Sequence, residues 1–247
     1  MPPDHLDFEI IGEEMQALVV TLDPNEAVVA EAGTMLSLED GIDMATSLSM
    51  NNENTGLLGK LMEAGKRAIA GDSFFVTIFT NKAPTPRDAC FAAPYPGRIV
   101  PIDLSLHRGQ LLCQRDSFLC AARGVKVEIA FTKRIGAGLF GGEGFILQRL
   151  SSDTGRGQAF LHAGGMVLEH SLDPGETLRV DTGCVVAFDT TVKYDIQMVA
   201  GLKNKLFGGE GLFFTTLTGP GKVWIQTLPF SRLADRVIAA SGVGSSD

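Results

Sequence analysis

Hydrophobic residues along the chain fall in short runs that are separated by turn residues. Apolar segments at 17–22, 98–104 and 166–172 each lead into a turn. In the first and third segments this turn reads Asp-Pro-x-Glu, in which proline presets φ and aspartate can bond its own backbone. Such runs and turns predict an all-β protein.

The segments that follow each turn also have the pattern of strands. Hairpins are expected where 27–30 and 34–38 flank a glycine turn, and where 177–180 and 184–188 do the same. The later strands are expected at 125–132, 192–199, 144–150 and 212–217. The alternation of Val125, Val127, Ile129 and Phe131 predicts one buried strand face.

Two segments have helical rather than strand periodicity. In the insertion at 56–70, apolar residues lie on one helical face and charged residues on the other, which predicts a short amphipathic helix. A second helix is expected from Ser231, its N-cap, with its end and a flexible tail in 236–247.

Internal similarity divides the chain into three tandem units. The sequence Leu-Phe-Gly-Gly-Glu-Gly at 139–144 recurs at 206–211, and a looser copy begins at Gly71. The Asp-Pro-x-Glu block at 23–26 likewise recurs at 173–176, and a looser block precedes Gln110. The predicted units are residues 1–95 with the helical insertion, 96–164 and 165–235. The glycines of the repeated loops are Gly71, Gly141, Gly142, Gly144, Gly208, Gly209 and Gly211.

Composition and charge narrow the class of protein further. Hydrophobic residues make up 45% and charged residues 20% of the chain, which suits a globular protein. The formal net charge of −8 makes nucleic acid an unfavourable partner. The acidic N-terminus, the lack of a long apolar stretch and four cysteines without C-x-x-C spacing together predict a cytoplasmic protein with buried free thiols.

The repeated loops supply the main candidate chemistry. Asp72, Glu143 and Glu210 occupy equivalent positions, so a threefold arrangement would bring three carboxylates together as ligands for Ca²⁺ or Mg²⁺. The alternative is that they stay apart and pair with nearby lysine and arginine residues. The glycines invite comparison with phosphate-binding loops, but their spacing matches neither nucleotide motif, which favours a structural role.

Candidate catalytic residues are few. His107 and His170 fall where a structural role is easily explained, and His162 with His170 lacks a third metal ligand at a telling spacing. There is no Gly-x-Ser-x-Gly elbow. The sequence therefore predicts no enzymatic activity and no cofactor.

Apolar residues of the loops and of the insertion are candidates for an interface, with burial in the core as the alternative. Exposed, they would bind another subunit or a membrane surface. The negative net charge disfavours an anionic bilayer, so subunit assembly is the preferred interpretation. The candidate interface residues are Leu57, Leu58, Leu61, Phe140 and Phe207.

The triplicated pattern and the Ala-x-Ala-Gly-Thr-Met-Leu segment at 30–36 resemble the bacterial family related to the altered-inheritance-of-mitochondria biogenesis protein. That family is similar in fold to the tryptophan RNA-binding attenuation protein. The resemblance covers roughly residues 6–238. It implies β-sandwich or double-stranded β-helix units with pseudo-threefold repetition and oligomeric assembly, and it transfers no catalytic residues.

These observations predict a non-enzymatic cytoplasmic protein that acts as a homo-oligomeric scaffold or binding module, with a trimer favoured and an unknown protein as further partner. The alternative is a sensor that binds a small ligand or a divalent metal in grooves between units or at the glycine-acid loops. RNA binding by analogy with the attenuation protein is a third hypothesis. It is weakened by the acidic composition, because phosphate contacts come mainly from Lys and Arg.

Overall fold

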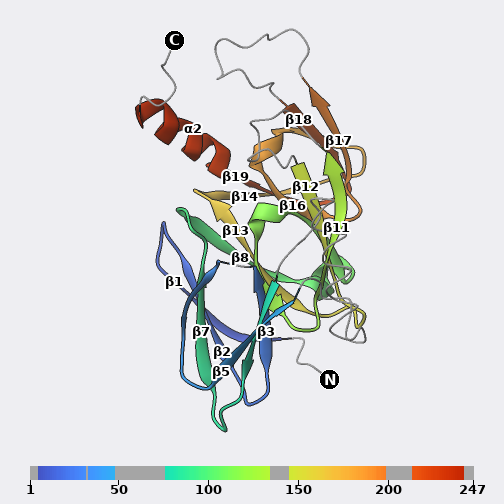
Figure 1. Ribbon diagram of the computed structural model, residues 1–247. Coiled ribbons are helices and arrows are strands. Elements are labelled where there is room, and N and C mark those ends of the chain that lie inside the picture. Colours follow the sequence, from blue (N-terminus) through green and yellow to red (C-terminus); the bar gives the residue numbers. More distant parts are fainter. Residues whose placement is uncertain (1–4, 32, 48–75, 134–144, 199–212, 242–247) are drawn as a thin grey trace, which may run out of the picture.

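The computed structural model describes residues 5–31, 33–47, 76–133, 145–198 and 213–241. Strands dominate these residues, and one α-helix, α2 (Phe230–Ser241), follows the last strand. In Figure 1 the N-terminal strands lie at the lower end, the C-terminal strands lie at the upper end, and α2 projects from the upper part. The prediction of an all-β protein with a C-terminal helix is confirmed.

The strands fall into three consecutive sets, with β1 (Asp7–Ile11) before the first. The first set is β2 (Ala17–Leu22), β3 (Ala27–Glu31), β4 (Met35–Leu38), β5 (Ile42–Ser47), β6 (Val76–Asn81) and β7 (Arg87–Ala92). The second set is β8 (Gly97–Asp103), β9 (Gln110–Gln114), β10 (Phe118–Ala122), β11 (Lys126–Lys133), β12 (Phe145–Ser151) and β13 (Gln158–Gly164). The third set is β14 (Val167–Leu172), β15 (Thr177–Asp181), β16 (Val185–Asp189), β17 (Lys193–Met198), β18 (Phe213–Thr218) and β19 (Gly221–Gln226).

One order of antiparallel pairing occurs in all three sets. The first strand pairs with the last, which also pairs with the third, as in β2-β7-β4, β8-β13-β10 and β14-β19-β16. The second strand pairs with the fifth, which also pairs with the fourth, as in β3-β6-β5, β9-β12-β11 and β15-β18-β17. Each set therefore consists of two groups of three strands.

Two joins connect the sets edge to edge. At the first join β10 of the second set pairs with β3 of the first, and at the second join β16 of the third set pairs with β9 of the second. These joins create two six-stranded sheets. The remaining groups form a four-stranded sheet, in which β1 is added beside β2, and a three-stranded sheet.

The core consists of two clusters that share one sheet. Leu111 and Cys113 of β9 pack into the larger cluster, whereas Leu112 of the same strand packs into the smaller one. Because successive side chains of a strand point to opposite faces, this six-stranded sheet carries core on both sides. Apolar runs such as β9 and β10 thus form strands that are buried on both faces.

The Asp-Pro-x-Glu turns are closed by their glutamates. Glu26 accepts a hydrogen bond from the Asp23 backbone N–H, and Glu176 accepts one from Asp173, both at 2.8 Å. The sequence pattern alone points to proline and aspartate as the residues that stabilise this turn. A carboxylate three residues later reaches back to the N–H that the turn leaves unpaired.

Two expectations need correction, and several fall outside the described residues. Ile129 is exposed rather than buried, because a register shift between Ile129 and Phe131 interrupts the alternation of β11 against β12. The C-terminal helix begins at Phe230, one residue before Ser231. The helix predicted at 56–70 and most of the predicted tail lie outside the described residues.

Candidate functional site

The loop and interface residues singled out in the sequence lie outside the part of the chain that the structure describes. This applies to the three carboxylates, the repeat glycines and the apolar loop residues, namely Asp72, Glu143, Glu210, Gly71, Gly141, Gly142, Gly144, Gly208, Gly209, Gly211, Leu57, Leu58, Leu61, Phe140 and Phe207. A metal site or an interface formed by these residues stays a prediction.

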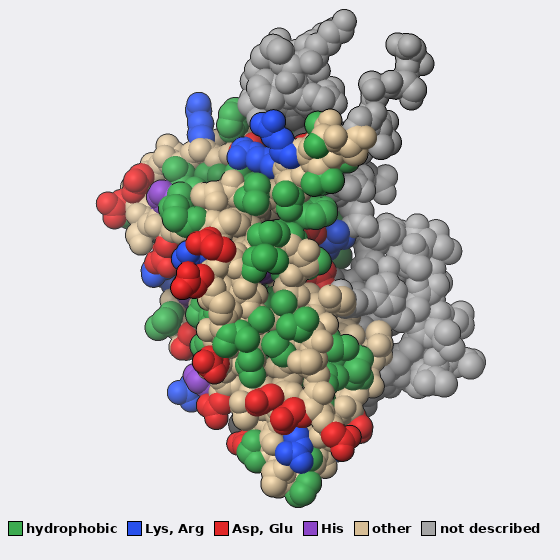
Figure 2. Space-filling view, turned by 90° about the vertical axis from the view of Figure 1, so that its left-hand side faces the viewer, with side chains coloured by type: hydrophobic (Ala, Val, Ile, Leu, Met, Phe, Trp, Pro, Cys, Tyr) green, Lys and Arg blue, Asp and Glu red, His purple; other side chains and the backbone are tan. Residues whose placement is uncertain are grey.

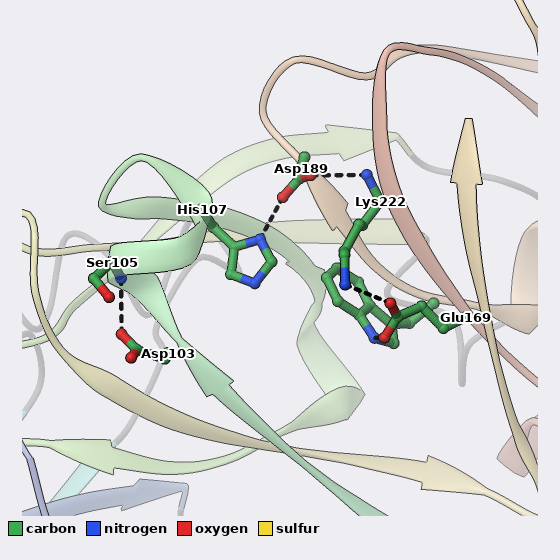
Figure 3. Close-up of polar contacts among 7 residues, drawn as sticks. Asp103, Ser105, His107, Glu169, Asp189 and Lys222 are labelled. Atoms are coloured by element: carbon green, nitrogen blue, oxygen red, sulfur yellow. Dashed lines mark hydrogen bonds and ion pairs between the residues drawn. The ribbon is translucent and has the colours of Figure 1, made fainter. Parts of the chain in front are cut away.

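A cluster of polar side chains lies instead at the second join (Figure 3). His107 ends the 3-10 helix η1 (Leu104–His107), which precedes β9, and Asp189 ends β16. The His107 Nδ1 atom lies 2.6 Å from Asp189 Oδ1, although 82 residues separate the two in sequence. Pairing of β9 with β16 brings their ends together, so the join itself builds this contact.

The Asp189 carboxylate also binds the neighbouring strand. Its Oδ2 atom accepts the backbone N–H of Lys222 in β19 at 2.7 Å. Burial raises the pKa of Asp189, but the hydrogen bonds from His107 and Lys222 outweigh it, and the net pKa lies below the usual value. An ionised carboxylate only accepts, so His107 Nδ1 carries the proton and donates.

The cluster continues across β19 to β14. Trp224 packs edge-on against the His107 ring with centroids 5.3 Å apart, and its Nε1–H donates to Glu169 of β14 at 3.0 Å. The ammonium of Lys222 lies 2.5 Å from the other oxygen of Glu169. One chain of contacts thus connects η1, β16, β19 and β14.

The chemistry of this cluster fits a clamp between strands. An Asp–His pair is also the orienting half of a general-base site, which would need a nucleophile or substrate proton next to the ring. Ser105, on the same 3-10 helix, donates its backbone N–H to Asp103 at 2.9 Å (Figure 3). Sequence reasoning missed the pair, because His107 and Asp189 stand in separate, unremarkable turns.

A second group of titratable side chains lies near the first join. Burial and the charge of Asp116 together raise the pKa of Glu31, the last residue of β3, to about 7, against the opposing effect of Arg115. Tyr95 packs edge-on against His162, with centroids 4.5 Å apart. Burial lowers the pKa of His162 to about 4, so this ring is neutral at pH 7.

All four cysteines are buried and free, as the sequence predicted. Burial raises the pKa of the Cys184 thiol to about 11, and it raises the pKa of Cys90, Cys113 and Cys120 as well. Because the thiolate is the reactive form, these side chains act as small hydrophobic groups at neutral pH.

The described residues contain no group of three or more His, Cys, Asp or Glu side chains that could hold a metal ion. Within the same residues, no helix has the length and apolar character needed to span a bilayer.

Some large apolar side chains are exposed at the surface. Figure 2 shows hydrophobic side chains gathered over the middle of one face and acidic side chains towards its lower end. Over the whole described surface, the exposed large apolar residues include Met15, Met35, Leu36, Met44, Leu106, Met166, Phe230, Val237 and Ile238.

Fold and polar cluster together define a class: an all-β protein of antiparallel sheets joined edge to edge, with a partly buried Asp–His clamp at one join. Residues 8–228 match the family model described as Mitochondrial biogenesis AIM24, and the chain belongs to this family. The family resemblance inferred from the sequence is therefore confirmed.

Two similar proteins come from Streptococcus pyogenes. An uncharacterized protein of serotype M6 is 30% identical over 229 residues, which cover 91% of this chain and 87% of that protein. An X-ray crystal structure of an S. pyogenes protein superposes with a TM-score of 0.72 and 21% identity, and it covers 96% of this chain and 100% of the other. This second likeness shows a shared fold.

Proposed function

We propose that the protein is a non-enzymatic homo-oligomeric scaffold or binding module, built of three tandem units at residues 1–95, 96–164 and 165–235. The recurrence of one pairing order in three strand sets supports the three units. Four free cysteines support a reducing compartment such as the cytoplasm.

Helix α2 is the observation that carries self-association. Its apolar residues follow helical spacing, but none of its twelve residues is buried. Val237 is 60% exposed and Ile238 is 57% exposed. A short helix gains most of its stability by packing its apolar face. We therefore expect this face of α2 to pack against a partner. A second copy of the chain is the proposed partner.

Native mass spectrometry of the full chain over a range of concentrations tests this function. We expect closed assemblies at multiples of 26.3 kDa, with the trimer favoured. Val237→Asp places a charge on the apolar face of α2 and is expected to weaken assembly. Ala239→Asp, on the opposite face of the helix, is the matched control. A monomer at every concentration would refute the proposal.

The alternative hypothesis of a divalent-metal sensor is tested separately, with two variants of the glycine-acid loops. Glu143→Gln and Glu210→Gln are expected to reduce the thermal stabilisation by a divalent cation if the loops bind one, and unchanged stabilisation in both variants would count against it.

A further inference from the structure

The two joins inside the chain follow one rule of strand pairing. In each, the third strand of one set lies antiparallel beside the second strand of the preceding set. At the first join the opposed residues are Cys120 and Ala30, Ala121 and Val29, and Ala122 and Val28. At the second join they are Ala187 and Cys113, Phe188 and Leu112, and Asp189 and Leu111.

A β-bulge identifies the matching residues of the three third strands. Each of these strands has the same register shift against the last strand of its set: between Phe118 and Cys120 in β10, between Val185 and Ala187 in β16, and between Met35 and Ser37 in β4. The residues inside the bulge are therefore Leu119, Val186 and Leu36. Through this bulge, β4 corresponds residue by residue to β10 and β16.

Burial differs sharply among these matching residues. Leu119 and Val186 are fully buried, whereas Leu36 is 61% exposed. The neighbouring Met35 is 40% exposed, although its counterparts Phe118 and Val185 are buried. Among the described strands β10 and β16 have a strand of another set alongside, whereas β4 pairs only with β7. The missing neighbour thus coincides with an exposed apolar pair.

The third set has the complementary open edge. Strand β15 corresponds to β3 and β9, and within the described residues it pairs only with β18. Thr177 and Arg179 of β15 are exposed and Leu178 is half-buried, whereas the inner residues of β3 and β9 are buried. Among the described strands, one third strand and one second strand, the two elements that form each join, are therefore left without a partner from another set.

We propose that β4 of one copy pairs antiparallel with β15 of a second copy, which repeats the internal joins between molecules. The register of those joins places Ser37 opposite Val180, Leu38 opposite Arg179, and Glu39 opposite Leu178. Strand β4 has neither proline nor a charged residue, the features that usually protect an open edge. The inference rests on the proposed self-association and adds a contact between strand edges to the contact proposed for α2. Such a head-to-tail contact extends into a ring or a filament, depending on the rotation between copies.

Cysteine cross-linking between two variants tests this register. Leu38→Cys and Arg179→Cys chains are mixed, allowed to exchange, oxidised and run on a non-reducing gel. We expect a covalent dimer, because directly opposed residues of antiparallel strands lie close enough for a disulfide. The matched control mixes Leu38→Cys with Asp195→Cys, which carries an exposed residue on β17 at the other edge of the same sheet.

A second experiment requires no oxidation. Leu36→Lys is expected to raise the concentration needed for assembly by at least about tenfold, because the join would bury the ammonium group. Met44→Lys, at a residue of similar exposure on the edge strand β5, is expected to leave assembly unchanged. Equal melting temperatures of the two variants would show that both fold.

The outcomes separate the two proposals. Oligomers in native mass spectra without a dimer above the control, or without an effect of Leu36→Lys, would overturn the β4–β15 contact and leave self-association standing. Monomers under all conditions would refute both the β4–β15 contact and the proposed self-association.

Discussion

The two joins inside the chain share a backbone register but differ in their side chains. The first, β3 with β10, is apolar throughout and brings small residues such as Val29 and Ala121 together. The second, β9 with β16, ends on Asp189, which holds His107 and the backbone of Lys222. Strand pairing and apolar burial therefore suffice for a join, and a polar clamp can be added at its end.

A charge inside the apolar join should have the largest effect. Ala121→Asp is expected to lower the free energy of unfolding by about 4 kcal/mol or more, because a fully buried carboxylate would have no partner. Urea unfolding at pH 7 measures this loss. Ala240→Asp, on the exposed helix α2, is the control, and a comparable small loss in both variants would show that the first join is loosely packed.

The polar clamp at the second join should contribute less. Asp189→Asn removes a charge-assisted hydrogen bond from the half-buried His107, which is expected to cost about 2 kcal/mol. Since the folded pKa of Asp189 lies below 3.8, its stabilisation is present above pH 3.8 and is lost as the pH falls through the folded value. The free energies of unfolding of the variant and the wild type should therefore converge in acid. A constant difference from pH 3 to pH 7 would contradict an ionic role.

Near the apolar join, a buried acid should oppose folding at neutral pH. The pKa of Glu31 rises from 4.5 to about 7 on folding, so stability falls as the pH rises from about 4.5 to about 7. Glu31→Gln is expected to be more stable than wild type above pH 7, by up to about 3 kcal/mol, and equal to it below pH 4.5. Melting temperatures across this range test the sign, with the exposed Glu9→Gln as control.

An exposed ion pair away from both joins should have the smallest effect. The Lys126 Nζ atom lies 2.6 Å from Asp153 Oδ2 at the surface. Lys126→Met is expected to change the free energy of unfolding by less than about 0.5 kcal/mol, because solvent screens such pairs. If this loss matched that of Asp189→Asn, burial would not explain the strength of the clamp.

Much of the strand layout could be predicted from the sequence, because it depends on local signals. The run at 17–22 is β2, and the segment at 166–172 contains β14. The C-terminal helix was predicted within one residue of its start. Ile129 was misplaced because a bulge depends on the partner strand, which the alternation of a single strand does not reveal.

The candidate site could not be predicted, because its residues meet only through long-range pairing. His107 and Asp189 stand near turns of different strand sets, and neither has a motif around it. The raised pKa of Glu31 likewise depends on burial and on Asp116, distant in sequence. Local patterns specify which segments become strands, whereas joins between sets decide which polar side chains become neighbours.

The position of Trp224 gives the second join an optical signal of its own. It is the only tryptophan of the chain, it is buried, and it contacts both the His107 ring and Glu169. Fluorescence excited at the red edge of protein absorbance therefore reports on the second join, whereas the first join contributes no tryptophan signal. Fluorescence emission followed during denaturation, beside circular dichroism of the whole chain, would reveal whether the two joins open together or in sequence.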